Sequence, residues 1–172
     1  MSYLLEKFCQ DCSLSLASSK MPQEEIRHSM EKLLSEPDFI EKYFSPEAEV
    51  GINVIHEDNK TGFQVLTHIY ANGKESPPHD HGTSWAVYGQ AVKYTDMTVW
   101  RRTGNGSNEN QVTVEPEKKF RLDPTMAGIF EIGKIHSIKF PDGASFLRVT
   151  GTNLNKIPTR SYSRDECRNA SN

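Results

Sequence analysis

The segment that decides the fold is residues 77–101, PPHDHGTSWAVYGQAVKYTDMTVWR. After two prolines and a His-x-His pair, it holds two runs rich in β-branched and aromatic residues, at 84–88 and 91–101. Runs of this composition are typical of strands, and Gly89 lies between them. The segment therefore predicts two strands that follow closely on a pair of histidines.

Similar runs recur on both sides of this segment. They cover residues 51–56, 62–70, 111–114, 119–122, 128–132, 136–140 and 144–150. Clusters of Asn, Gly and Pro separate them, as expected for turns. No helical pattern lies between the strands, which excludes a parallel α/β fold. Eight or nine short strands predict an all-β barrel or a double-sheet jelly roll.

The residues before the first strand read as helical. A first amphipathic stretch meets a serine-rich break at 13–19, and Pro22 and Pro37 each open a further helix. The tail after Ile157 is polar, and we expect it to be frayed. The chain is thus predicted to be a single domain with three parts, namely a helical segment packed on the barrel at 1–46, the barrel at 47–157 and the polar tail at 158–172.

The composition excludes several classes of protein. Of the 172 residues, 35% are hydrophobic, and 20 basic against 23 acidic side chains give a net charge of −3. This balance predicts no binding to nucleic acid or to anionic membranes. We find no apolar run long enough to span a bilayer, no signal peptide, and too few cysteines (three) for a disulfide scaffold. We expect a cytoplasmic protein, monomeric or homodimeric.

Six histidines include one informative group. His79 and His81 are two residues apart, so in an extended chain their rings face the same side while Asp80 faces the other. A third histidine, His136, follows a turn at Gly133 at the start of another predicted strand. No acidic residue follows His81 closely, so the simplest metal site is three neutral imidazoles. The alternative is a pair of ordinary surface-strand histidines.

These motifs resemble the cupin superfamily and, within it, the cysteine dioxygenase-like (thiol dioxygenase) branch. The similarity covers roughly residues 20–155 and rests on Pro78-His79-Asp80-His81-Gly82, Gly89 and Gly133-Lys134-Ile135-His136. That branch also has N-terminal helices and lacks the usual cupin glutamate. The resemblance implies a cupin double-stranded β-helix, a jelly-roll barrel with N-terminal helices, in which His79, His81 and His136 bind Fe(II). Three histidines also suit Zn, Mn or Ni.

The sequence departs from that branch at three places. The branch holds the substrate carboxylate with an Arg or Gln on an earlier strand, and residues 51–55 contain no Arg. Ala86 stands where some members have a cysteine that is crosslinked to tyrosine. The relay Ser-x-His-x-Tyr of the last strand is replaced by Phe146, Arg148 and Thr150. We therefore expect a divergent member for which cysteine itself is a doubtful substrate.

Arg148 and Thr150 are the candidate catalytic residues. By strand alternation they share a face with Phe146, and the family's inward-facing relay maps to this face. A guanidinium there could hold a carboxylate or superoxide; the alternative is a strand-end arginine paired with a surface acid. Four aromatic residues are candidates for the pocket wall or, alternatively, plain core: Tyr70, Trp85, Tyr88 and Phe146.

Three other features have simpler interpretations. His68 lies in an apolar strand and is expected to be buried and hydrogen-bonded rather than a fourth metal ligand. Cys9 and Cys12 have redox spacing, but they are expected on the buried face of a helix. The charged residues at 115–119 are expected to form a solvated turn.

The predicted activity is that of a mononuclear non-haem iron dioxygenase. It would use O2 to oxidise a small anionic substrate, with a thiol-bearing carboxylate (thiol to sulfinate) as the leading class. Three neutral ligands leave a divalent metal its full charge, which attracts such an anion. The alternatives are a diketone-type C–C-cleaving dioxygenase, a lyase or isomerase with another divalent metal, and a non-catalytic cupin that binds a small molecule.

Overall fold

The computed structural model describes residues 3–103 and 112–164. Its helices are α1 (Leu5–Ser18), α2 (Pro22–Leu34), α3 (Pro37–Phe44) and the short 3-10 helix η2 (Leu154–Lys156). Its strands are β1 (Gly51–Glu57), β2 (Gln64–Ile69), β3 (Lys74–Glu75), β4 (Ala86–Val92), β5 (Thr95–Thr103), β6 (Thr113–Leu122), β7 (Ala127–Phe130), β8 (Ile135–Phe140), β9 (Ser145–Thr150) and β10 (Ser163–Arg164). No helix of the described ranges is long and apolar enough to cross a membrane.

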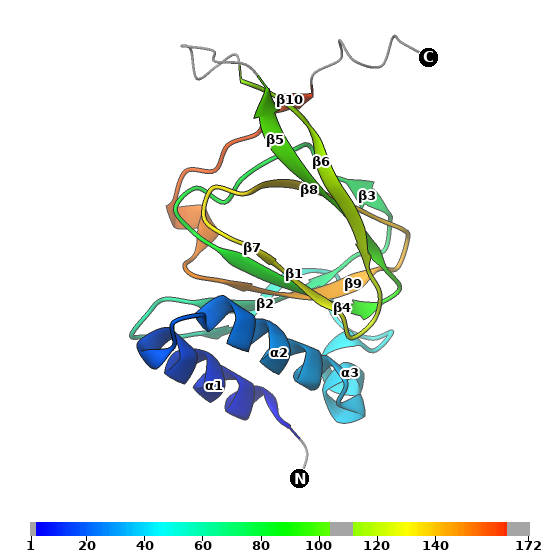
Figure 1. The fold of residues 1–172 in the computed structure, drawn as a ribbon. Coiled ribbons are helices and arrows are strands. Elements are labelled where there is room, and N and C mark those ends of the chain that lie inside the picture. The colour runs from blue at the N-terminus through cyan, green and yellow to red at the C-terminus, as the bar shows by residue number, and fades with distance from the viewer. Residues whose placement is uncertain (1–2, 104–111, 165–172) are drawn as a thin grey trace.

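The strands form two five-stranded sheets that face each other (Figure 1). One sheet has the order β1-β2-β9-β4-β7 and the other β10-β6-β5-β8-β3, with antiparallel pairing except between β10 and β6. Strands far apart in the sequence are neighbours in both sheets, as in β2 with β9 and β5 with β8. This topology is a double-stranded β-helix with N-terminal helices, so the predicted fold class is confirmed.

The three helices cover the outer face of the first sheet, which lies between them and the barrel interior (Figure 1). One hydrophobic cluster joins residues of all three helices to alternate residues of β4 and β9, such as Val87, Leu147 and Val149. The other alternate residues, among them Tyr88 and Phe146, belong to a second cluster inside the barrel. Strands β4 and β9 of the first sheet are therefore buried on both faces, and strand alternation decides which of their side chains reach the interior.

Two local predictions were wrong. The serine-rich stretch is helical up to Ser18, and within the helix Ser13 and Ser18 donate hydrogen bonds to carbonyl oxygens four residues earlier (3.0 and 2.8 Å). The predicted turn at 115–119 lies within β6, where Pro116 is paired with Trp100 at an irregularity in the β5–β6 register. A proline is tolerated in a strand at such a place. Cys9 and Cys12 are buried on a helix, as expected.

The first part of the tail also differs from the expectation of fraying. β10 pairs with β6, and Tyr162 is only 9% exposed. The hydrogen bonds responsible involve residues about 80 positions earlier, which local composition does not reveal. The cluster of Gly and Asn residues at 104–110, one of those expected to form turns, and the end of the tail lie outside the described residues.

Gly89 allows helix α2 to lie close to β4. A Cβ atom placed at this position would be 2.4 Å from the Met30 sulfur and 2.5 Å from a methyl group of Leu34. Both side chains are buried in the cluster beneath the sheet, so they have little room to move. A side chain at this position would force Met30 and Leu34 to change conformation or α2 to move.

We predict that Gly89→Ala lowers the free energy of unfolding by about 1–3 kcal/mol, because the extra methyl overpacks the helix–sheet interface. Denaturant titration measures the change. Gly128→Ala is the matched control, since a Cβ there meets ring and methyl carbons of Phe120 and Leu122 at ordinary distances of 3.5–3.7 Å. Equal stabilities of the two variants would contradict the prediction.

Candidate metal centre

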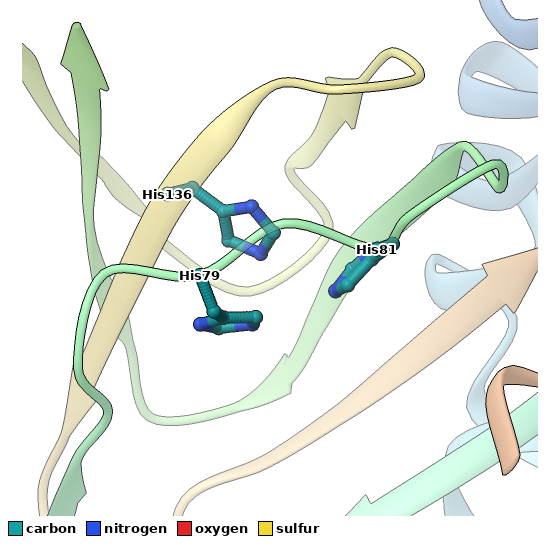
Figure 2. A group of neighbouring side chains, drawn as sticks. All are labelled: His79, His81 and His136. Atoms are coloured by element: carbon teal, nitrogen blue, oxygen red, sulfur yellow. The ribbon is translucent and has the colours of Figure 1, made fainter. Parts of the chain in front are cut away.

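The structure brings the three predicted metal-ligating histidines together (Figure 2). His79 and His81 lie on the segment between β3 and β4, and His136 lies on β8. Their potential ligand atoms are all within 4.8 Å of one another, and their ring centroids are 4.5–5.4 Å apart. His136 is fully buried and His81 is 4% exposed.

Backbone hydrogen bonds hold two of these residues side by side. The His79 N–H donates to the His136 carbonyl and the His136 N–H donates to the His79 carbonyl, both at 2.9 Å. This reciprocal pair is an isolated antiparallel bridge, so the two Cα atoms are set by main-chain geometry. The expected turn is present before β8, where Gly133 has φ +77°.

The ring nitrogens are arranged as a metal would require. Nδ1 of His79 is 2.9 Å from the Pro77 carbonyl oxygen, which places its proton there and leaves Nε2 free. Nε2 of His136 is buried and has no hydrogen-bond partner. Nε2 of His81 is 3.3 Å from the Tyr88 hydroxyl. A buried nitrogen without a partner costs free energy that a bound cation would recover, so these residues fit a divalent metal.

The histidines are neutral at physiological pH. Burial lowers the pKa of His81 to about 3, with smaller contributions from Arg148 and His79. Burial likewise lowers the pKa of His79, and it lowers that of His136 well below its usual value. Only a neutral imidazole has a lone pair to give, so the site is prepared to bind a metal without first losing protons.

Asp80 points away from the metal site and anchors the segment that carries the ligands. One carboxylate oxygen accepts a hydrogen bond of 2.5 Å from the Tyr162 hydroxyl, and the other accepts from the N–H groups of Gly82 and Arg160 (2.9 and 3.3 Å). Burial opposes ionisation, but these bonds lower the pKa of Asp80 overall. Arg102 in turn donates to the Tyr162 hydroxyl at 3.1 Å. Residues 158–164 therefore form a strap that holds the segment carrying His79 and His81, and no local feature of the sequence indicates this contact.

Arg148 lies on the inner face of the first sheet, in one row with Leu66 and Tyr88 of the flanking strands. Its guanidinium carbon is 5.9 Å from the Tyr88 ring, and its charge contributes to the lowered pKa values of all three histidines. Its Nε is buried without a partner, and no carboxylate of the described residues pairs with it. The alternative of a surface-paired arginine therefore does not hold.

The candidate pocket residues divide between the two faces of the sheet. Tyr70, Tyr88 and Phe146 belong to the cluster inside the barrel. Trp85 does not: it packs with the helices on the outer face, against Gly151. Its prediction as a pocket wall was wrong because Trp85 has the strand parity of Val87, which faces the helices. Thr150 is fully buried, and its hydroxyl donates to the Thr152 carbonyl oxygen at 2.8 Å.

Phe130 is a neighbour of the centre that sequence reasoning missed. Its ring stacks on His136 with centroids 4.1 Å apart. It also lines a cavity of about 680 Å³ between the start of α2 and strands β5–β7, whose rim carries both acidic and basic side chains. The three histidines do not line this cavity. The alternation of β7 could have indicated an inward Phe130, but not its contact with β8.

No family model and no curated protein matches the sequence. Solved structures with similar folds include a conserved protein with a double-stranded beta-helix domain from Klebsiella pneumoniae, at 16% identity and TM-score 0.46, with 73% of this chain and 95% of that chain covered. A second is a cupin superfamily protein from Desulfitobacterium hafniense, at 14% identity and TM-score 0.45, with 61% of this chain and 79% of that chain covered. A third is the DMSP lyase DddQ from Ruegeria pomeroyi, at 12% identity and TM-score 0.42, with 59% of this chain and 44% of that chain covered. Likenesses this distant assign no activity to the chain, and its fold rests on the strand topology.

We predict that Tyr162→Phe weakens metal binding about tenfold, the lower end of the effect expected when a partner that orients ligands is lost. The variant keeps the ring and removes the hydrogen bond to Asp80. Titration of the metal-free protein with Co(II), followed by absorbance, measures the affinity. Tyr94→Phe is the control, because Tyr94 contacts Arg121 rather than the strap. Equal Co(II) affinities for parent and Tyr162→Phe would contradict the prediction.

We also predict that the metal-free protein loses stability as the pH falls below about 6.5. Folding depresses the pKa values of His68, His79, His81 and His136, so below pH 6.5 the unfolded chain binds more protons than the folded one. Each such histidine lowers the free energy of unfolding by about 1.4 kcal/mol per pH unit until its folded pKa is reached. Denaturant titrations at about pH 7.5 and 5.5 measure the loss; equal stabilities would contradict it.

Proposed function

We propose that the protein is a mononuclear non-haem iron dioxygenase that oxidises a small anionic substrate with O2. The leading substrate class is a thiol-bearing carboxylate, converted to its sulfinate with both oxygen atoms entering the product. One observation carries the proposal: the unpaired guanidinium of Arg148 lies inside the barrel beside three neutral imidazoles that converge on one point.

The electrostatics of the interior support an anionic substrate. The three histidines neutralise none of the charge of a divalent ion, and Arg148 adds a positive charge nearby. Asp80, the one buried acid among the described residues, is turned toward Tyr162 and already accepts three hydrogen bonds. A thiolate with a carboxylate matches these charges, whereas the ammonium group of an amino acid would find no counter-charge there.

Bound Fe(II) would supply the redox chemistry that activates O2 and open positions that bring both reactants into contact. The protein's own residues then have three tasks. Arg148 orients the substrate carboxylate by charge-assisted hydrogen bonds. The Tyr88 hydroxyl, 3.3 Å from His81 Nε2, provides a hydrogen-bonding group at the edge of the ligand set. Phe146, which is 2% exposed, keeps water from the reacting groups.

A second candidate is a cupin with different chemistry on the same site. Thr150 replaces the tyrosine of the family relay, and its hydroxyl is bonded to a backbone carbonyl. The missing relay favours a diketone-type C–C-cleaving dioxygenase, a lyase or isomerase using Zn, Mn or Ni, or a non-catalytic binding protein. A metal-loaded protein that consumes no O2 with thiols would support this second candidate.

We predict that protein purified without chelators contains about one iron per chain. It should consume O2 with 3-mercaptopropionate, one O2 per sulfinate formed, and should consume less with diketones or hydroxy acids. His136→Gln should lose both iron and O2 uptake, while the matched surface variant His28→Gln keeps both, because His28 is exposed on α2. Failure of the metal-free protein to take up Fe(II) would refute the dioxygenase proposal.

A further inference from the structure

Apart from His136 of the triad, five buried side-chain polar atoms of the described residues have no hydrogen-bond partner, and two of them lie on adjacent strands of the first sheet. One is Nε2 of His68, a residue on β2 that is 2% exposed, and the other is Nε of Arg148 on β9. A buried nitrogen that has given up water without gaining a hydrogen bond is unfavourable, so such atoms in native proteins commonly await a ligand or an ordered water.

The two atoms belong to neighbouring positions on one face of the sheet. His68 is paired with Phe146, and Arg148 is two residues further along β9, paired with Leu66. Such diagonal neighbours have Cα atoms about 7–8 Å apart, within reach of a long side chain. The His68 ring stacks on the Phe146 ring at 4.6 Å and 16°, which fixes its plane. Arg148 and His81 both contribute to the lowered pKa of His68, so it lies in the same interior as the metal site.

The second nitrogen of His68 is already engaged. Its Nδ1 is 3.2 Å from the hydroxyl of Tyr70, whose ring packs on Phe140 with centroids 4.5 Å apart. Burial, with contributions from Arg148 and His81, lowers the pKa of His68 to about 2, so the ring is neutral and carries one proton. When the Tyr70 hydroxyl donates to Nδ1, that proton is on Nε2, which becomes a hydrogen-bond donor.

We propose that His68 and Arg148 form one carboxylate-binding subsite, in which Tyr70 sets the tautomer of His68. The carboxylate accepts hydrogen bonds from the Arg148 guanidinium and from His68 Nε2. One guanidinium and one neutral donor balance a single negative charge, which favours a monoanionic carboxylate over a phosphate dianion. The inference rests on the proposed function, because it assigns the substrate's carboxylate end to this subsite and its reacting end to the metal.

His68→Phe is the sharpest variant, because it keeps an aromatic ring against Phe146 and removes both nitrogens. The probe is propionate, added to the Zn(II)-loaded protein so that no turnover occurs and followed by NMR. We expect the affinity for propionate to fall about tenfold in His68→Phe, the usual effect of losing a hydrogen bond to a charged group. The affinity for propionate should fall at least as much in Arg148→Ala, and it should fall less in Tyr70→Phe.

The controls separate binding from folding. His56→Phe is the matched variant, because His56 also has a buried unpartnered Nε2 but lies against Phe63, away from this row. It should bind propionate as the parent does. Ethanethiol, which has no carboxylate, should bind the Co(II)-loaded His68→Phe variant within about twofold of the parent. His68→Gln, which restores a donor, should recover part of the propionate affinity.

The outcomes distinguish this proposal from the preceding one. Propionate binding that depends on His68, without O2 uptake on thiols, supports the subsite and refutes the dioxygenase. O2 uptake with unchanged propionate affinity in His68→Phe refutes the subsite alone. A parent protein that does not bind propionate refutes the subsite, as does a His68→Phe variant that loses metal as well, because His68 then has a structural role.

Discussion

The reciprocal backbone hydrogen bonds between His79 and His136 are the interaction on which the metal centre depends. They join a segment with little secondary structure of its own to β8, and on its other side His79 bridges Ser161 of the strap. His79 is thus held between two neighbouring backbones as in a sheet. The positions of the ligands follow from main-chain pairing, and the rings need only rotate to meet a metal.

The strap extends this constraint to the second ligand on the segment. Asp80, the residue between His79 and His81, has its carboxylate fixed by three hydrogen bonds, two from Arg160 and Tyr162 of the strap and one from Gly82. Gly82 lets the chain turn there, with φ +58°, and a Cβ atom at this position would be 2.2 Å from the Pro158 carbonyl oxygen. The strap and the ligand segment therefore fit together only with glycine at this position.

The interior of the barrel favours an anionic ligand, because its positive charge has no acidic partner among the described residues. Burial keeps the histidines neutral, and Arg148 has no acidic partner among the residues of the described ranges. An isolated cation in a half-buried position is unfavourable unless an anion joins it. The unpartnered Nε2 of His68 is likewise unfavourable until a ligand accepts a hydrogen bond from it. The groups that would hold the substrate's negative charge therefore lie on the first sheet, and not on the segment that carries the metal ligands.

Strand alternation was sufficient to predict the inward face of β9, because Phe146 and Arg148 are well inside a regular strand. The same alternation separates Trp85 from Tyr88, because residues three positions apart face opposite sides of a strand; the two cannot line one pocket, and Trp85 packs with the helices. The strap was missed because its contact, Tyr162 with Asp80, spans 82 residues. Composition near Tyr162 is polar and contains nothing that distinguishes a packed segment from a frayed one.

By itself, the sequence determined an all-β barrel or jelly roll behind N-terminal helices and the three histidines as a candidate metal set, because periodicity, turn residues and the His-x-His spacing are local properties. Only the tertiary structure decided that Asp80 is held by the strap, that Trp85 faces the helices, and that His68 and Arg148 leave nitrogens unpartnered on one inner face. These depend on which strands pair across the barrel, and the pairing of β2 and β4 with β9 brings together residues more than 50 positions apart.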